Sequence, residues 1–152
     1  MKSFLLNSSN KPIIQWGSLP DGVHFEGSVP PGYSKAVAPS GNIVILDVDL
    51  KGDKDGYSHI PMLIMAELQE TFNYKTKSGG GHFWLHYTGS KTLINRATSL
   101  GLDLRIGAKE GNCGGYVKYH HTIDIRECEH LILNSSELMN KWLEKLFSNS
   151  EE

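Results

Sequence analysis

Residues 41–50 read Gly-Asn-Ile-Val-Ile-Leu-Asp-Val-Asp-Leu, and no other stretch constrains the fold as strongly. Four consecutive branched apolar residues predict a buried strand. Side chains alternate across a strand, so Asp47 and Asp49 project from the same face. Two carboxylates at a buried strand end repel each other and lose hydration, and a divalent metal with oxygen ligands, Mg²⁺ or Mn²⁺, would offset both effects. The alternative is a polar turn in which the two acids only solubilise the strand end.

Length and charge set the broad class. The chain has 152 residues, which suits one domain with a sizeable core. A formal net charge of −2 does not indicate a nucleic-acid-binding protein, so any such surface has to be a local patch. The two cysteines, Cys113 and Cys128, lack Cys-x-x-Cys spacing and indicate neither a disulfide framework nor a zinc knuckle.

The sequence predicts no membrane segment. No run approaches the roughly 18 apolar residues of a membrane span, and the first residues contain no signal-peptide core. We therefore expect a soluble, cytoplasmic protein. The small size of the chain would suit a protein encoded by a prokaryotic plasmid or virus.

Short elements are predicted along the rest of the chain. Gly, Pro and Ser are frequent over residues 8–39, which favours extended segments over regular helix. Ser58 is a candidate cap for a helix over residues 58–70. Strands are predicted at residues 71–75, 82–87, 102–105, 116–119 and 122–125.

The clearest helix is predicted near the C-terminus. Asn134 and Glu137 resemble a capping box at its start. Its apolar residues recur at helical spacing and predict a core-facing stripe made of Leu138, Met139, Trp142, Leu143 and Leu146. Residues 148–152 are expected to be a short disordered tail.

Two further motifs could supply chemistry. Residues 76–82 read Thr-Lys-Ser-Gly-Gly-Gly-His, where small residues let backbone N–H groups approach a phosphate, with Lys77 and His82 beside them. A flexible hairpin loop is the alternative, since the spacing is not that of a P-loop. Asp103 and Arg105 share a strand face, for which the alternative is an ion-paired edge strand.

Together, the acid pair, the phosphate-binding loop and the later acid match metal-assisted nucleotidyl transfer. In that chemistry two metal ions about 4 Å apart activate the attacking hydroxyl and neutralise the leaving pyrophosphate. Carboxylates have to bridge the two ions, which requires at least two acids and usually three.

In this order, the motifs resemble those of the prim-pol domain (bifunctional DNA primase/polymerase, N-terminal type) of the archaeo-eukaryotic primase superfamily. That family has a hydrophobic strand ending in Asp-x-Asp/Glu, then a Ser-x-His-type motif, then an Asp in a Gly-x-Asp-x-Arg context. The corresponding residues here are 45–49, 76–82 and 101–105, and the resemblance spans roughly residues 11–118. Two departures are Lys77, where the family often has Pro, and residues 118–121, where a proline-containing loop is expected.

The resemblance implies an α/β (α+β) fold with an RRM-like mixed or antiparallel sheet flanked by helices, the primase-polymerase catalytic core, in a single domain over residues 1–147. It implies that Asp47, Asp49 and Asp103 bind Mg²⁺ or Mn²⁺ and, together with His82, form the catalytic set. The nucleotide's phosphates would be contacted by Lys77, Ser78, Gly79, Gly80, His82 and Arg105.

The activity that the resemblance implies is an enzymatic one in DNA replication. Nucleoside triphosphates would be added to a 3′ hydroxyl on a primer opposite a single-stranded DNA template. A helicase or a helical accessory domain in trans would assist, and template-directed extension is expected ahead of unaided primer synthesis.

Other functions stay open on the sequence. A non-catalytic nucleotide- or single-stranded-DNA-binding accessory module would keep the fold, although DNA binding gains nothing from an acid pair. A metal-dependent nuclease could use the same acids, although the phosphate loop favours transfer. A rolling-circle nuclease is not indicated, because its His-hydrophobic-His motif is missing; the adjacent His120 and His121 are expected at the surface or at a strand edge.

Overall fold

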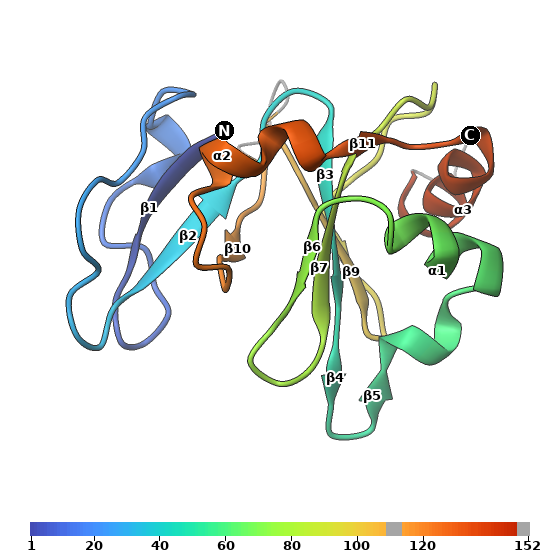
Figure 1. Cartoon of the computed structure of the whole chain (residues 1–152), viewed down its shortest axis with the longest axis horizontal. Coiled ribbons are helices and arrows are strands. Elements are labelled where there is room, and N and C mark those ends of the chain that lie inside the picture. The colour runs from blue at the N-terminus through green and yellow to red at the C-terminus, as the bar shows by residue number, and fades with distance from the viewer. Residues whose placement is uncertain (109–113, 149–152) are drawn as a thin grey trace.

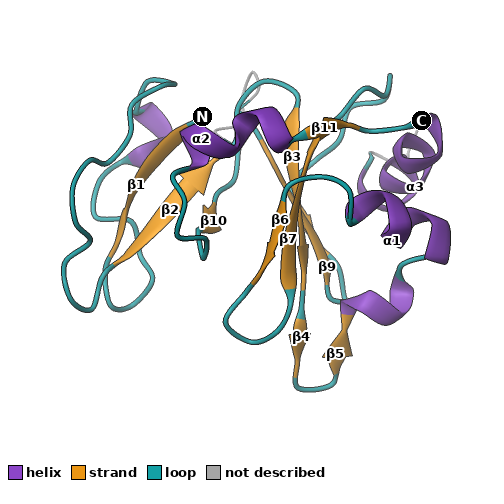
Figure 2. Ribbon diagram, viewed as in Figure 1, coloured by secondary structure: helices purple, strands orange, loops and turns teal. Residues whose placement is uncertain are grey.

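The computed structural model describes residues 1–108 and 114–148, which form an α+β domain (Figures 1 and 2). Its strands are β1 (Lys2–Leu6), β2 (Ser34–Ala38), β3 (Ile43–Val48), β4 (Leu50–Lys51), β5 (Lys54–Asp55), β6 (Asn73–Lys75), β7 (Gly81–His86), β8 (Arg96–Ala97), β9 (Leu102–Ile106), β10 (Val117–Lys118) and β11 (Leu133–Asn134). Its helices are α1 (Met62–Leu68), α2 (Ile125–Cys128) and α3 (Glu137–Phe147), with 3₁₀ turns η1 (Trp16–Ser18), η2 (Gly56–His59) and η3 (Glu129–Leu131).

Two sheets organise the chain. The larger sheet has the order β11-β7-β3-β9-β8, with β6 also paired to β7, and the smaller one has the order β1-β2-β10. Strand β3 is antiparallel to both of its neighbours, β7 and β9. The prediction of a buried central strand in the 41–50 stretch is therefore confirmed.

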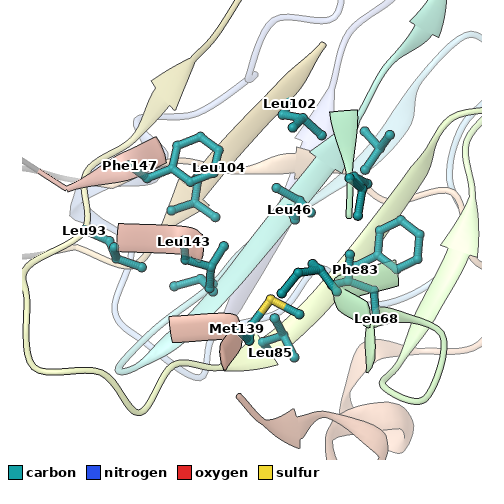
Figure 3. Packing of buried hydrophobic residues seen from close by; sticks show 14 of the residues in the cluster. Leu46, Leu68, Phe83, Leu85, Leu93, Leu102, Leu104, Met139, Leu143 and Phe147 are labelled. Atoms are coloured by element: carbon teal, nitrogen blue, oxygen red, sulfur yellow. The ribbon is translucent and has the colours of Figure 1, made fainter. Parts of the chain in front are cut away.

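Both faces of β3 are covered, which explains its continuous apolar run. Leu46 points to the side covered by α1 and α3, where Met139 and Leu143 are fully buried (Figure 3). Ile45 points to the other side, where the small sheet contributes Val37 to the core. Helices α1 and α3 thus lie on one face of the larger sheet, and the small sheet and α2 lie on the other, as Figure 1 shows.

The two predicted helices begin later than expected. The Ser58 cap is wrong, because Ser58 lies in η2 and α1 begins at Met62, directly after Pro61. The Asn134 cap is also wrong: Asn134 pairs with β7 in strand β11, and the hydroxyl of Ser136 accepts a hydrogen bond from the Met139 N–H at 3.1 Å. Pairing with the sheet therefore moves the start of α3 two residues along the chain.

Two further differences concern strands. The strand predicted at residues 122–125 is wrong, because Asp124 caps helix α2 by accepting a hydrogen bond from the Arg126 N–H at 2.9 Å. Strand β1 was not predicted, and it is paired along its whole length with β2. Its pairing brings the N-terminus into the small sheet.

The predicted stripe on α3 is divided between core and surface. Met139 and Leu143 are buried, Trp142 and Leu146 are partly buried, and Leu138 is 51% exposed. The apolar stripe is wider than the part of α3 that packs on the sheet, so only one edge of the stripe is buried.

The predicted C-terminal tail is described only at its first residue. Ser148 is buried and bridged to Leu93, whereas residues 149–152 of the expected tail lie outside the described residues, as does Cys113. None of the helices in the described part of the chain is long and apolar enough to cross a membrane.

Helix α3 offers a direct test of the core. We expect Leu143→Ala to lower the free energy of unfolding by about 2–5 kcal/mol, because it leaves a cavity between α3 and the sheet. The matched control, Leu131→Ala, removes a side chain that is 46% exposed in η3 and should change it by no more than about 0.5 kcal/mol. Urea denaturation followed by circular dichroism measures both, and equal losses in the two variants would contradict this packing.

Candidate active site

A row of polar side chains crosses the larger sheet at the end of β3. Asp47 is directly opposite His82 on β7 and opposite Asp103 on β9. His82 is in turn opposite Tyr74 on β6. Directly paired residues of antiparallel strands place their side chains on one face, so four strands bring these groups side by side. Three residues predicted from separate sequence motifs therefore meet here.

His82 is held in one orientation within this row. It is buried, its Nδ1 lies 2.9 Å from the Tyr74 hydroxyl, and its Nε2 lies 3.4 Å from Asp47 Oδ1. Burial raises the pKa of Tyr74 well above its usual range, so the phenol keeps its proton and is able to donate a hydrogen bond to Nδ1. In the tautomer in which Nδ1 accepts, the neutral ring carries its proton on Nε2, which faces the carboxylate of Asp47.

The backbone holds Asp49 one residue beyond the end of β3. Its N–H donates to the Gly101 carbonyl and its carbonyl accepts from the Gly56 N–H, each at 2.8 Å. A Cβ atom on Gly56 would lie 2.3 Å from the Gly101 oxygen, so the close approach requires glycine there. Burial, followed by the negative charge of Asp47, raises the pKa of Asp49.

Asp103 is the most enclosed of the three acids. It is 9% exposed, and its Oδ1 is buried without a hydrogen-bond partner among the described residues. Its Oδ2 lies 3.8 Å from the guanidinium of Arg105. Burial and then the charge of Asp49 raise the pKa of Asp103, which outweighs the opposing effect of Arg105. Arg105 therefore offsets only part of the negative charge of the row.

An open pocket of about 380 Å³ lies over this row, between the two sheets. The β6–β7 hairpin forms one wall, and the segment that follows β10 forms the other. Its lining residues are Asp47, Asp49, Lys51, Thr76, Lys77, Ser78, His82, Lys118 and His120. Lys51 and Lys77 form no ion pair with any described residue, so their charges are available at the pocket.

Four residues assigned to the site from the sequence do not line this pocket. Asp103 lies beside Asp47 on the next strand, with Arg105 next to it. Gly79 has a φ of +95°, and a Cβ atom on Gly80 would lie 2.1 Å from the Val48 carbonyl oxygen. The hairpin turn itself therefore requires these two glycines, while Lys77 and Ser78 reach the pocket.

The wall formed by residues 118–120 was missed by sequence reasoning. The ring of His120 lies 5.8 Å from that of His82, and His120 is half-buried. Burial, and then the proximity of His82, lowers the pKa of His120. His121 instead packs against the ring of Phe72 at 5.4 Å. Alternation with the buried Val117 and Tyr119 is the one sequence signal that could have indicated the pocket wall.

The carboxylate row matches a hard divalent cation in ligand type, because Mg²⁺ and Mn²⁺ prefer oxygen ligands. The unpartnered Oδ1 of Asp103 is a further oxygen donor with no other use in the fold. Within residues 1–108 and 114–148, no three His, Cys, Asp or Glu side chains are grouped closely enough to hold a metal ion as they stand. The donors agree with the cation in kind, but their side chains would have to converge.

The fold and the site define an α+β domain with an acidic pocket, rimmed by lysines, between two sheets. No protein-family model matches this chain, and no curated protein matches it in sequence.

The raised pKa of Asp103 has a measurable effect on stability. The ordinary pKa of an aspartate is 3.8, so ionisation of Asp103 destabilises the fold as the pH rises above that value. We expect Asp103→Asn to raise the free energy of unfolding at pH 7 by about 0.5–2 kcal/mol in buffer without divalent metal. The gain should disappear near pH 4.

Urea denaturation at the two pH values measures this effect. Asp53→Asn is the control, since Asp53 is exposed in the turn between β4 and β5 and should not change the stability at either pH. A loss of stability in Asp103→Asn at pH 7 would contradict a raised pKa for Asp103.

Proposed function

We propose that this chain is a metal-dependent, template-directed nucleotidyltransferase of the primase-polymerase type. The observation that supports it most is the row of Asp47, His82 and Asp103 on adjacent strands, beside a pocket rimmed by unpaired lysines. An acidic floor suits divalent cations and a basic rim suits a polyphosphate, and nucleotidyl transfer requires both.

Asp47, Asp49 and Asp103 would hold Mg²⁺ or Mn²⁺. When bound, such an ion acidifies the attacking 3′ hydroxyl and neutralises charge on the transferred phosphate. The raised pKa values of Asp49 and Asp103 support this assignment, because burial and the neighbouring carboxylates outweigh the nearby positive charges.

The phosphates of the incoming nucleotide would lie between the two walls of the pocket. Lys77 and Ser78 offer an ammonium and a hydroxyl from the hairpin, and His82 offers its Nε2 proton from the floor. Lys118 and His120 face them from the other wall. A volume of about 380 Å³ falls in the range of small-ligand sites and suits the triphosphate with part of the nucleoside.

In the proposed reaction the 3′ hydroxyl loses its proton to solvent and its oxygen forms a bond to the α-phosphorus of the nucleotide. The bond from that phosphorus to the bridging oxygen breaks, and pyrophosphate leaves. Lys77 and Lys118 would stabilise the charge that accumulates on the leaving group, since both can donate hydrogen bonds to phosphate oxygens.

Primer extension tests the catalytic proposal. With Mg²⁺ or Mn²⁺, a DNA template, an annealed primer and nucleoside triphosphates, we expect the wild-type chain to lengthen the primer. The double variant Asp47→Ala/Asp49→Ala should be slower by at least about a hundredfold, because it removes carboxylates that neutralise the reacting phosphate through the cation.

The control for this experiment is Asp53→Ala, an exposed acid four residues beyond Asp49 that should leave the rate unchanged. De novo priming is measured in parallel by leaving out the primer. If the wild type shows no metal-dependent incorporation over varied templates and nucleotides, the proposed enzymatic activity is refuted. Degradation of labelled DNA without nucleotides would instead identify a nuclease.

Nucleotide binding can be separated from catalysis at the hairpin. We expect Lys77→Gln to weaken the affinity for a nucleoside triphosphate with Mg²⁺ by about tenfold, as the loss of one charge-assisted hydrogen bond implies. Lys75→Gln is the matched control, because Lys75 is on the same hairpin but does not line the pocket. Isothermal titration calorimetry measures both dissociation constants. Metal-dependent binding without incorporation would favour the non-catalytic accessory module.

A further inference from the structure

The layer formed by α1 and α3, called here the helix layer, carries the three most exposed large apolar side chains of the described residues. Met62 and Leu63 at the start of α1 are 85% and 70% exposed, and Leu138 on α3 is 51% exposed. Exposed apolar residues of this size, gathered in one layer, indicate an interaction surface. The layer covers one face of the larger sheet (Figure 1), and Asp47 and the pocket lie on the opposite face, because Leu46 and Val48 on either side of Asp47 point to the helices.

On α3 the apolar residues have a regular spacing. Leu138, Trp142 and Leu146 recur every four residues, so they form one side of the helix next to its core-facing side. Trp142 and Leu146 are only partly buried against the core. Leu138 and Leu146 each lie four residues from Trp142, so the apolar side chains on this side are spaced symmetrically about Trp142.

The exposed charged side chains at the two ends of α3 are opposite in sign, whereas Glu144, near the C-terminal end, is partly buried and accepts a hydrogen bond from the Tyr87 hydroxyl. At its N-terminal end, Glu137 is exposed and Glu67 of α1 accepts a hydrogen bond from the Ser136 N–H at 2.9 Å. At its C-terminal end, Lys145 is exposed and the Arg96 guanidinium donates to the Leu146 carbonyl at 3.0 Å. Lys141, in the middle, is ion-paired with Glu137 at 3.6 Å.

We propose that this layer is the interface of a homodimer in which α3 packs antiparallel to the α3 of a second copy. A two-fold axis near Trp142 would place Leu138 against Leu146 of the second copy, in agreement with the self-complementary pattern of an isologous interface. The same axis places the acidic end of each helix beside the basic end of the other. Because α3 is complementary in charge to an antiparallel copy of itself, the partner that this surface fits best is a second copy of the chain.

The proposal is independent of the nucleotidyltransferase function, because the interface and the pocket lie on opposite faces of the larger sheet. The first experiment is sedimentation equilibrium of the full chain between about 1 and 100 µM, a range that detects micromolar dissociation constants. We expect the wild type to form dimers. Leu138→Glu should raise the dissociation constant at least about tenfold, as the loss of a central apolar contact implies.

Leu131→Glu is the matched control, since Leu131 is 46% exposed but lies in η3, outside the helix layer. It should dimerise as the wild type does. A monomeric wild type over the whole range, or a dimer that Leu138→Glu leaves intact, overturns the proposal.

A charge exchange tests the antiparallel arrangement and does not depend on how Leu138→Glu folds. Glu137→Lys and Lys145→Glu should each weaken the dimer severalfold, because each places like charges together. The double variant should recover most of the wild-type affinity. Circular dichroism of each variant confirms that its helices are intact, and a double variant that is weaker than both single variants overturns the antiparallel interface.

Discussion

The antiparallel register that holds β3 between β7 and β9 is the constraint from which the pocket follows. Because Asp47 is paired with His82 on one side and Asp103 on the other, three groups from distant segments lie on one face. A slip of one residue along β3 would turn Asp47 into the apolar layer beneath α1 and α3. The burial of Leu46 and Val48 on that side excludes the slip, so the hydrophobic core determines where the acids are displayed.

Asp49 and Asp103 destabilise the fold that positions them. Burial raises the pKa values of Asp49 and Asp103, and one oxygen of Asp103 has no partner in the described part of the chain. The fold tolerates this because β3 is apolar along its other residues and is covered on both faces. Perturbed carboxylates in a pocket are typical of functional sites, and this is the main physical reason to assign chemistry to the sequence motif.

The sequence predicts this arrangement where local pattern determines it. Strict alternation predicts that Asp47 and Asp49 leave β3 on one face, and it also predicts a strand at His82. The caps of the helices were less predictable, since both Asn134 and Ser136 can cap a helix and only the pairing of Asn134 with His86 decides between them. Asp124 acts as a helix cap in a segment whose composition suggests a strand, so tertiary context overrides propensity there.

The second wall of the pocket depends on contacts that no local pattern encodes. Residues 118–120 reach the site because β10 pairs with β2, about eighty residues earlier in the chain. Lys118 and His120 then face Lys77 across a space whose floor is acidic. A net charge of −2 conceals this distribution, because the acids and the lysines line different parts of one pocket. Local separation of charge, which a composition cannot express, is what makes the pocket suitable for a polyphosphate together with a cation.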